Sequence, residues 1–258
     1  MAAPAGPVLP HGGRGAVPAS RTGRGVRPDG PLVVGHAKQR CVLAVLLMDA
    51  GAVVPAAGLI DRVWGNDPPD GALNVLYSYV CRLRRALGPA GVPLLRRSGG
   101  YLLDVDRDRV DVHRFRRLAA TADAAPDPAA ALDAALALWG GTALSGLAGP
   151  WAGSVRATLD DERVAVLMAR NEVHLAAGRP AEVVRVLRDA VAARPDDERL
   201  VEQLMLALYR CGLPAEARRQ YRAVADRAAA EGAAPGRRLR DLHERIRRAD
   251  PVLAVGQP

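Results

Sequence analysis

The feature that most constrains this chain is a segment without any acidic side chain. Between Gly71 and Leu103 there is no Asp or Glu, yet the segment carries five arginines, at positions 82, 84, 85, 96 and 97. Protein faces that only meet water usually mix both signs of charge. The segment therefore predicts a surface that faces a polyanion, with a simple solvated face as the alternative.

The first half of this segment is expected to form one helix with two different faces. Apolar residues recur at helical spacing and predict a buried stripe made of Leu76, Val80, Leu83 and Leu87. The opposite side can donate hydrogen bonds and carry charge through Tyr77, Ser78, Cys81, Arg82 and Arg85. Gly88-Pro89 ends the helix.

The second half of the segment predicts a β-hairpin. Two short apolar runs, Val92–Leu95 and Tyr101–Val105, are joined by Arg-Arg-Ser-Gly-Gly. A helix with a cationic outer face followed by a basic hairpin is what a winged helix needs in order to bind duplex DNA. The helix fills the major groove, and the hairpin reaches the backbone or the adjacent minor groove.

The residues before this segment are expected to complete a winged-helix domain over residues 31–106. Helices are predicted at Ala37–Ala50 and Ala56–Trp64, and one short strand at Pro31–Val34. Residues 1–30 are rich in Gly, Pro, Ala and Arg and show no periodicity. We interpret them as a disordered basic arm.

An internal repeat organises the second half of the chain. Gly178-Arg-Pro-Ala-Glu182 recurs as Gly212-Leu-Pro-Ala-Glu216, 34 residues later, which is the period of tetratricopeptide helix pairs. The repeat predicts a stack of four helices, at Ala181–Ala193, Asp196–Cys211, Ala215–Ala230 and Arg237–Arg248. Further helices are expected ahead of the stack, at Asp111–Ala122, Ala129–Trp139 and Trp151–Ala177. The chain should thus be mainly α-helical, with an all-α domain over residues 111–250 and a tail over residues 251–258.

Charge divides the chain in the same place. Residues 1–103 hold 12 basic and 5 acidic side chains, whereas residues 104–258 hold 24 basic and 23 acidic ones. The first part is therefore expected to face the polyanion, and the nearly neutral second part to meet protein.

Other classes of function find no support in the sequence. Cys41, Cys81 and Cys211 are odd in number and far apart, and the five histidines show no ligand spacing, so no disulfide, metal site or cofactor is expected. Nothing resembles a nucleophile elbow, a catalytic triad or a paired-carboxylate site, so we expect no enzyme. No apolar run reaches membrane-spanning length, and a signal-peptide core is missing. A reducing cytoplasm is the expected location.

Several motifs together resemble one known family. The LIDRVWG run, the DPP turn, the helix ending CRLRRALG and the RSGGYLLDV hairpin look like the OmpR-type winged helix. More narrowly, they resemble the antibiotic regulatory proteins of filamentous actinobacteria. That family joins this winged helix to a bacterial transcriptional activation domain built of tetratricopeptide-like helices, whose opening resembles DVHRF at Asp111–Phe115. The resemblance covers roughly residues 31–250.

The resemblance implies a pathway-specific transcriptional activator, often of a secondary-metabolite gene cluster. Such proteins bind direct repeats in double-stranded DNA near promoters as a head-to-tail pair and recruit RNA polymerase. The chain departs from the family in two places. The small antiparallel sheet that usually precedes the first helix is absent or degenerate, and Pro55 stands where a Ser or Thr usually caps the second helix.

The arginines are the strongest candidates for DNA contact. By position, Arg82, Arg84 and Arg85 match the family's RLRR, and Arg96 and Arg97 match its wing. Arg82 can reach a guanine edge or a phosphate, and Arg85 suits a phosphate. Arg84 lies nearer the flank and can instead pair with an acid of the helical domain. Because Arg96 and Arg97 alternate faces on a strand, only one is expected to reach DNA well.

Weaker candidates lie at the starts of two helices, and they are Asn74, Tyr77, Ser78, Lys38 and Arg40. The first three lie near the groove-entering end, where base contact competes with simple exposure or a helix-start role. The last two can touch the DNA backbone. Trp64 and Tyr101 are expected in the core. The alternative function is a tetratricopeptide adaptor whose basic N-terminal half binds an acidic protein.

Overall fold

The computed structural model of the chain describes residues 35–254, which form a mainly helical protein with one small sheet, as predicted. The chain divides into two compact units. The first runs to Thr121 and resumes over Ala134–Arg163, and the second covers Ala122–Asp133 and continues from Val164. The expected basic arm, the expected strand at Pro31–Val34 and residues 255–258 lie outside the described residues.

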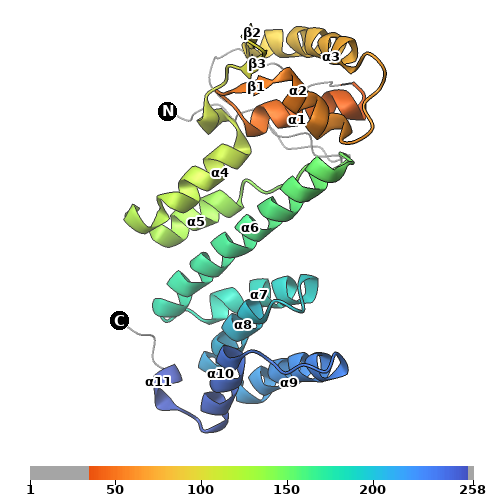
Figure 1. Cartoon of the computed structure of the whole chain (residues 1–258). Helices are drawn as coiled ribbons and strands as arrows, with labels where there is room; N and C mark the ends of the chain where they lie inside the picture. The colour runs from red at the N-terminus through yellow and green to blue at the C-terminus, as the bar shows by residue number, and fades with distance from the viewer. Residues whose placement is uncertain (1–34, 255–258) are drawn as a thin grey trace. The chain divides into compact units, whose positions relative to one another are not determined.

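The first unit begins with three helices (Figure 1), namely α1 (Ala37–Met48), α2 (Ala56–Trp64) and α3 (Ala72–Leu87). Helix α1 contributes the centre of the core, because its apolar residues are buried around nearly the whole helix. It ends at Met48, two residues before the predicted end, because Asp49 leaves the helical conformation. The bounds of α2 are those that the sequence predicts.

The sheet has three antiparallel strands in the order β1-β3-β2, which are β1 (Val53–Pro55), β2 (Leu94–Arg97) and β3 (Gly100–Leu103). Strands β2 and β3 form the predicted hairpin. Their pairing continues to Arg97 opposite Gly100, so the arginine pair belongs to the strand and only Ser98 and Gly99 form the turn. Strand β1 is not predicted from the sequence, and it pairs with the far side of β3.

The tightest packing in this sheet is at Gly100. A Cβ atom at this position would lie 2.2 Å from the carbonyl oxygen of Val54, so β1 can approach β3 only because residue 100 has no side chain. Its neighbour Gly99 has a φ of +73°, which the two-residue turn requires and which other residues rarely adopt.

The remaining helices are α4 (Asp111–Ala120), α5 (Pro128–Leu136), α6 (Pro150–Ala176), α7 (Ala181–Ala193), α8 (Glu198–Arg210), α9 (Pro214–Ala230), α10 (Arg237–Arg247) and α11 (Pro251–Ala254). Helix α4 belongs to the first unit, and α6 contributes residues to both units. The stretch expected to be a tail begins with the short helix α11. No helix within residues 35–254 is long and apolar enough to cross a membrane.

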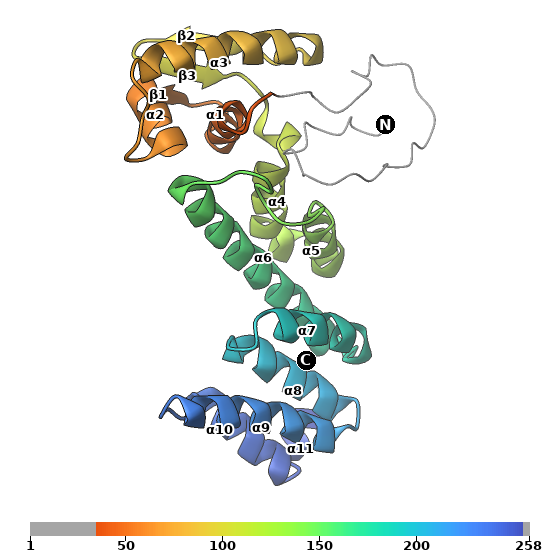
Figure 2. The same ribbon diagram turned by 90° about the vertical axis from the view of Figure 1, so that its right-hand side faces the viewer.

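The 34-residue repeat has a clear structural basis. Gly178 and Gly212 have φ values of +70° and +75°, and each ends a helix in the same way. The amide of the next residue donates to a carbonyl five residues back, from Arg179 to His174 and from Leu213 to Leu208, both at 2.9 Å. The next helix begins shortly after each of these glycines, α7 after Gly178 and α9 after Gly212. Helices α7, α8 and α9 pack one against the next (Figure 2).

Replacement of Gly100 by alanine should destabilise the first unit. The added methyl group meets the Val54 backbone, and overpacking of this kind costs about 1–3 kcal/mol. The free energy of unfolding from urea titrations measures the effect. The matched control is Gly58→Ala, where the new methyl group meets no atom within 4 Å. This helical substitution should raise stability by about 0.5–1 kcal/mol. Equal stability of the two variants would contradict the role of Gly100.

Candidate nucleic-acid interface

Helix α3 has the two faces that the sequence predicts. The apolar stripe of Leu76, Val80, Leu83 and Leu87 is at most 3% exposed and packs in the core of the first unit. The opposite face is exposed along the helix and carries Asn74, Tyr77, Ser78, Arg82 and Arg85. Burial of the stripe therefore fixes the rotation of α3 and keeps the polar face in solvent.

The exposed arginines of this face and of the hairpin have no counter-ion in the part of the chain that the structure describes. Within residues 35–254, no carboxylate forms an ion pair with Arg82, Arg85, Arg96 or Arg97. The first turn of α3 also contains no acidic residue. These guanidinium groups keep their donors available for phosphates or base edges.

The hairpin presents both of its arginines. Arg96 and Arg97 are exposed, although the alternation of a strand predicts that one of them faces inward. The reason is that β2 is the edge strand of the sheet, and its last two residues extend beyond the core toward the turn. The Nη1 of Arg97 donates to the carbonyl of Arg96 at 3.4 Å, and the other donors of both side chains can reach a nucleic acid beside α3.

Arg84 connects the helix to the hairpin. Its Nε donates to the carbonyl oxygen of Leu94 at 2.7 Å, and the side chain is half-buried between α3 and β2. The sequence suggests an acid of the helical domain as an alternative partner, and the structure shows this main-chain carbonyl instead. A DNA contact through the remaining guanidinium nitrogens stays a prediction.

The weaker candidates make local contacts. The Nζ of Lys38 donates to the carbonyl of Val63 at 2.6 Å and so satisfies the C-terminal end of α2. The Ser78 hydroxyl donates to the carbonyl of Asn74 at 3.1 Å, within α3. Arg40 is half-buried. Lys38 and Arg40 are therefore less available to DNA than the arginines of α3.

The aromatic side chains divide between core and surface. Tyr101 is buried, whereas Trp64 is half-buried, packs against the core and stacks on Tyr79 with ring centroids 6.1 Å apart. Leu73 is 58% exposed one turn before the exposed Tyr77, and the sequence pattern does not predict it as a contact residue. An unburied leucine at the start of this helix can contact the methyl group of a thymine.

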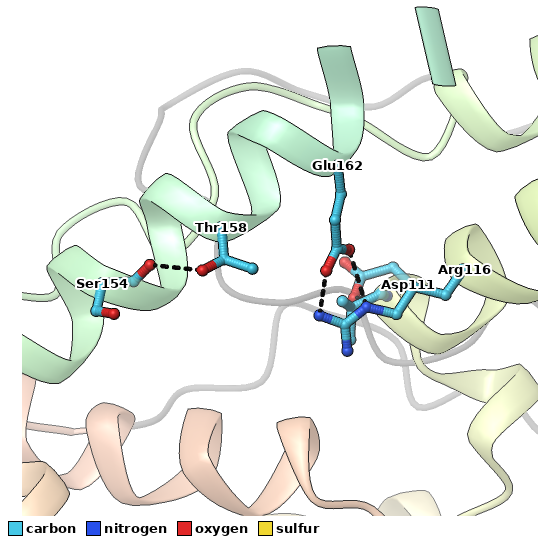
Figure 3. A network of polar contacts seen from close by, with 6 residues as sticks. Asp111, Arg116, Ser154, Thr158 and Glu162 are labelled. Carbon is cyan, nitrogen blue, oxygen red and sulfur yellow. Dashed lines mark hydrogen bonds and ion pairs between the residues drawn. The ribbon is translucent and has the colours of Figure 1, made fainter. Parts of the chain in front are cut away.

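Helix α4 supports the winged helix from outside. In Figure 3, Glu162 of α6 reaches Arg116 of α4 in a two-pronged ion pair, with both N–O distances 2.9 Å. The Nε2 atom of His113 lies 3.0 Å from the carbonyl oxygen of Leu47 at the end of α1. Burial lowers the pKa of His113, and the hydrogen bond to Leu47 acts in the opposite direction. Because the carbonyl oxygen can only accept, the Nε2–H of the ring donates this hydrogen bond.

The described residues contain no arrangement suited to metal binding. Over residues 35–254, no group of three or more His, Cys, Asp or Glu side chains could hold a metal ion. Cys41, Cys81 and Cys211 are free thiols, and burial raises the pKa of Cys41. The outward face of α3 presents guanidinium, amide and hydroxyl groups.

Comparison with known proteins matches both parts of the chain to families of regulators. The family described as "Transcriptional regulatory protein, C terminal" matches residues 31–103, and the family described as "Bacterial transcriptional activator domain" matches residues 110–247.

Individual relatives extend the match over most of the chain. "Regulatory protein DnrI" of Streptomyces peucetius is 37% identical, over 89% of this chain and 94% of its own length. "Regulatory protein AfsR" of Streptomyces coelicolor is 41% identical over 86% of this chain, which spans only 23% of AfsR. A solved structure of Mycobacterium tuberculosis EmbR in complex with a low affinity phosphopeptide superposes with a TM-score of 0.78 and 32% identity. It covers 86% of this chain, which spans 62% of the EmbR chain.

Replacement of Arg84 by alanine should loosen the hairpin, because the carbonyl of Leu94 loses its charged donor. Hydrogen bonds to charged groups contribute about 1.5–3 kcal/mol, and partial exposure places this one at the lower end. Amide hydrogen exchange of β2 and β3 should become faster. Arg85→Ala is the matched control, since Arg85 is exposed on the same helix and should leave exchange unchanged. Slow exchange in both variants would show that Arg84 does not hold the hairpin.

Proposed function

This chain belongs to the family of bacterial transcriptional regulators that carry the transcriptional activator domain, and on that premise we propose that it binds duplex DNA sequence-specifically as an activator. Residues 31–106 would bind the DNA, and residues 111–250 would act on the transcription machinery. The observation that carries this proposal is the outward face of α3, where Arg82 and Arg85 are exposed near the C-terminal end and Asn74 is exposed near the N-terminal end.

Each group on this face has a matching group in the major groove. The guanidinium of Arg82 has the two parallel donors that guanine O6 and N7 accept. The amide of Asn74 can pair with adenine N6 and N7. Arg85 lies about one turn further along and suits a phosphate, which would fix the register of the helix without specifying sequence.

The hairpin would supply the second contact. Arg96 and Arg97 project from the edge strand, and Arg84 holds that strand beside α3. Contacts from such a wing reach the sugar-phosphate backbone or the adjacent minor groove. They add affinity that depends strongly on salt.

At the level of the cell, we propose an activator of a secondary-metabolite gene cluster. It would bind direct repeats near promoters as a head-to-tail pair and recruit RNA polymerase through the helical domain, in the cytoplasm at the nucleoid. The support is the resemblance to antibiotic regulatory proteins, together with relatives named as regulatory proteins.

Capture of genomic fragments by the full chain, followed by a motif search, tests this proposal. We expect a direct repeat whose half-sites are spaced by about one helical turn of DNA. Competition with excess nonspecific duplex DNA distinguishes this function from the alternative one. An adaptor would keep its acidic protein partner in the presence of that DNA. Enrichment of no common motif would contradict sequence-specific binding.

Arg82→Ala should lower affinity for the captured site by about 1–3 kcal/mol and relax the preference at one base pair, because the bidentate guanine contact is lost. Gel-shift titrations against the site and its single-base variants measure both effects. Arg185→Ala removes an equally positive, exposed side chain from α7 and should bind like the parent. Parental affinity in Arg82→Ala would rule out this groove contact.

The double substitution Arg96→Ala with Arg97→Ala should weaken binding to all sequences alike. It should reduce the slope of log K against log salt by about 1 for each lost phosphate contact. Titrations between low and physiological salt give the slope. An unchanged slope would remove the hairpin from the interface while leaving the assignment of α3 intact.

A further inference from the structure

The second unit contains a cavity that the proposed DNA-binding function does not use. Its volume is about 620 Å³, and it lies between α6, α8, α10 and α11. Small-molecule sites typically measure about 300–1,000 Å³ and are mostly apolar. The apolar part of this cavity comes from Met168, Leu175, Leu206, Leu242 and Leu253.

Helix α11 is held firmly as one wall of the cavity. The Nε of Arg210 donates to the carbonyl of Leu253 at 2.9 Å, and the Tyr209 hydroxyl donates to the carbonyl of Asp250 at 3.3 Å. The Nε of Arg245 donates to the carboxylate of Asp250 at 2.7 Å. A cavity walled by four helices suits a compact ligand better than an extended segment of chain.

Most charged groups around the cavity already have partners in the protein. Arg199 makes two contacts with Asp197, at 3.0 and 2.9 Å. Arg210 also donates from Nη1 to the carbonyl of Leu175 at 2.9 Å. Asp241 lies 3.6 Å from Arg237. These residues line the cavity, but their charges are already neutralised or hydrogen-bonded within the protein and do not require a charged ligand.

Glu202 and Arg238 are different, because neither side chain forms a hydrogen bond or ion pair within residues 35–254. The positive charge of the exposed Arg238 acts on Glu202 only from beyond ion-pair distance. Glu202 is half-buried in the cavity wall on α8. Glu172 lines the same cavity from α6 and accepts one long hydrogen bond, 3.3 Å, from the Nε2 of Gln203. Burial raises the pKa of Glu202, and the negative charges of Glu172 and Glu198 raise it further, while Arg238 acts in the opposite direction.

We propose that this cavity binds an amphipathic organic amine, with an apolar body against the leucines and an ammonium group between Glu202 and Glu172. A cation at this point would form the direct ion pair that Glu202 lacks, since Arg238 acts on it only from a greater distance, and would offset the repulsion between the two carboxylates. The apolar floor accounts for the rest of the ligand. The site does not depend on DNA binding, so either proposal can fail without the other.

Dansylcadaverine is a suitable probe, because it combines a primary amine with an apolar fluorophore whose emission increases in an apolar environment. Titrated into the full chain, it should give a saturable increase in fluorescence. Its N-acetylated form, which is neutral, should bind about tenfold more weakly, because the contact between charges is lost. The anion 8-anilinonaphthalene-1-sulfonate should bind more weakly than dansylcadaverine.

Two substitutions place the probe in the cavity. Glu202→Gln keeps the shape and should weaken dansylcadaverine binding about tenfold while leaving the N-acetylated form unaffected. Leu206→Trp should fill the apolar part and abolish binding of both forms. Glu231→Gln is the matched control on an exposed acid outside the cavity, and it should bind like the parent. Circular dichroism checks that each variant is folded.

Several results would overturn the proposal. These are parental binding of dansylcadaverine by Glu202→Gln or by Leu206→Trp, absence of saturable binding to the parent chain, and tighter binding of the anion than of the amine. Parental binding by either variant would show that the probe binds elsewhere. Tighter binding of the anion would show that the cavity prefers the opposite charge.

Discussion

Burial of one stripe of α3 determines what the other side of the helix presents. Leu76, Val80 and Leu83 are completely buried, and burial of such side chains contributes about 1.5–3 kcal/mol each. A rotation that brought Arg82 inward would expose these residues and bury a guanidinium group, for which no buried carboxylate is present among residues 35–254. The same packing that stabilises the first unit therefore aligns the exposed arginines on one face, and no separate device is needed to orient them.

The helix and the hairpin act as one surface because Arg84 joins them. Arg84 lies between Arg82 and Arg85 in the sequence, and both of those remain exposed. Arg84 itself has a structural role, because it donates to the carbonyl of Leu94 and so holds β2 beside α3. Behind this surface, His113 reaches the end of α1, and Arg116 joins α4 to α6. The winged helix is thus supported by elements that follow it in sequence. This explains why the first compact unit extends past the hairpin.

The sequence predicts elements whose signals are local. Helix α2 and the buried stripe of α3 follow from periodicity alone, and the repeated glycine caps follow from a five-residue pattern. Strand β1 could not be predicted, because three residues carry little pattern and their partners, such as Tyr101 for Val54, are distant in sequence. Three further features likewise depend on how elements pack together. They are the partner of Arg84, the exposure of both Arg96 and Arg97, and the cavity beside Glu202. Periodicity does not encode that packing.

The most direct test of the central claim is a dimethyl sulfate footprint on a captured DNA site, because this reagent methylates guanine N7 in the major groove. If the outward face of α3 lies in that groove, the parent chain should protect specific guanines. The Arg82→Ala variant, at saturating concentration, should lose protection at one of them and keep the others. Binding that leaves every guanine N7 fully reactive would contradict the claim, because α3 would then lie outside the major groove.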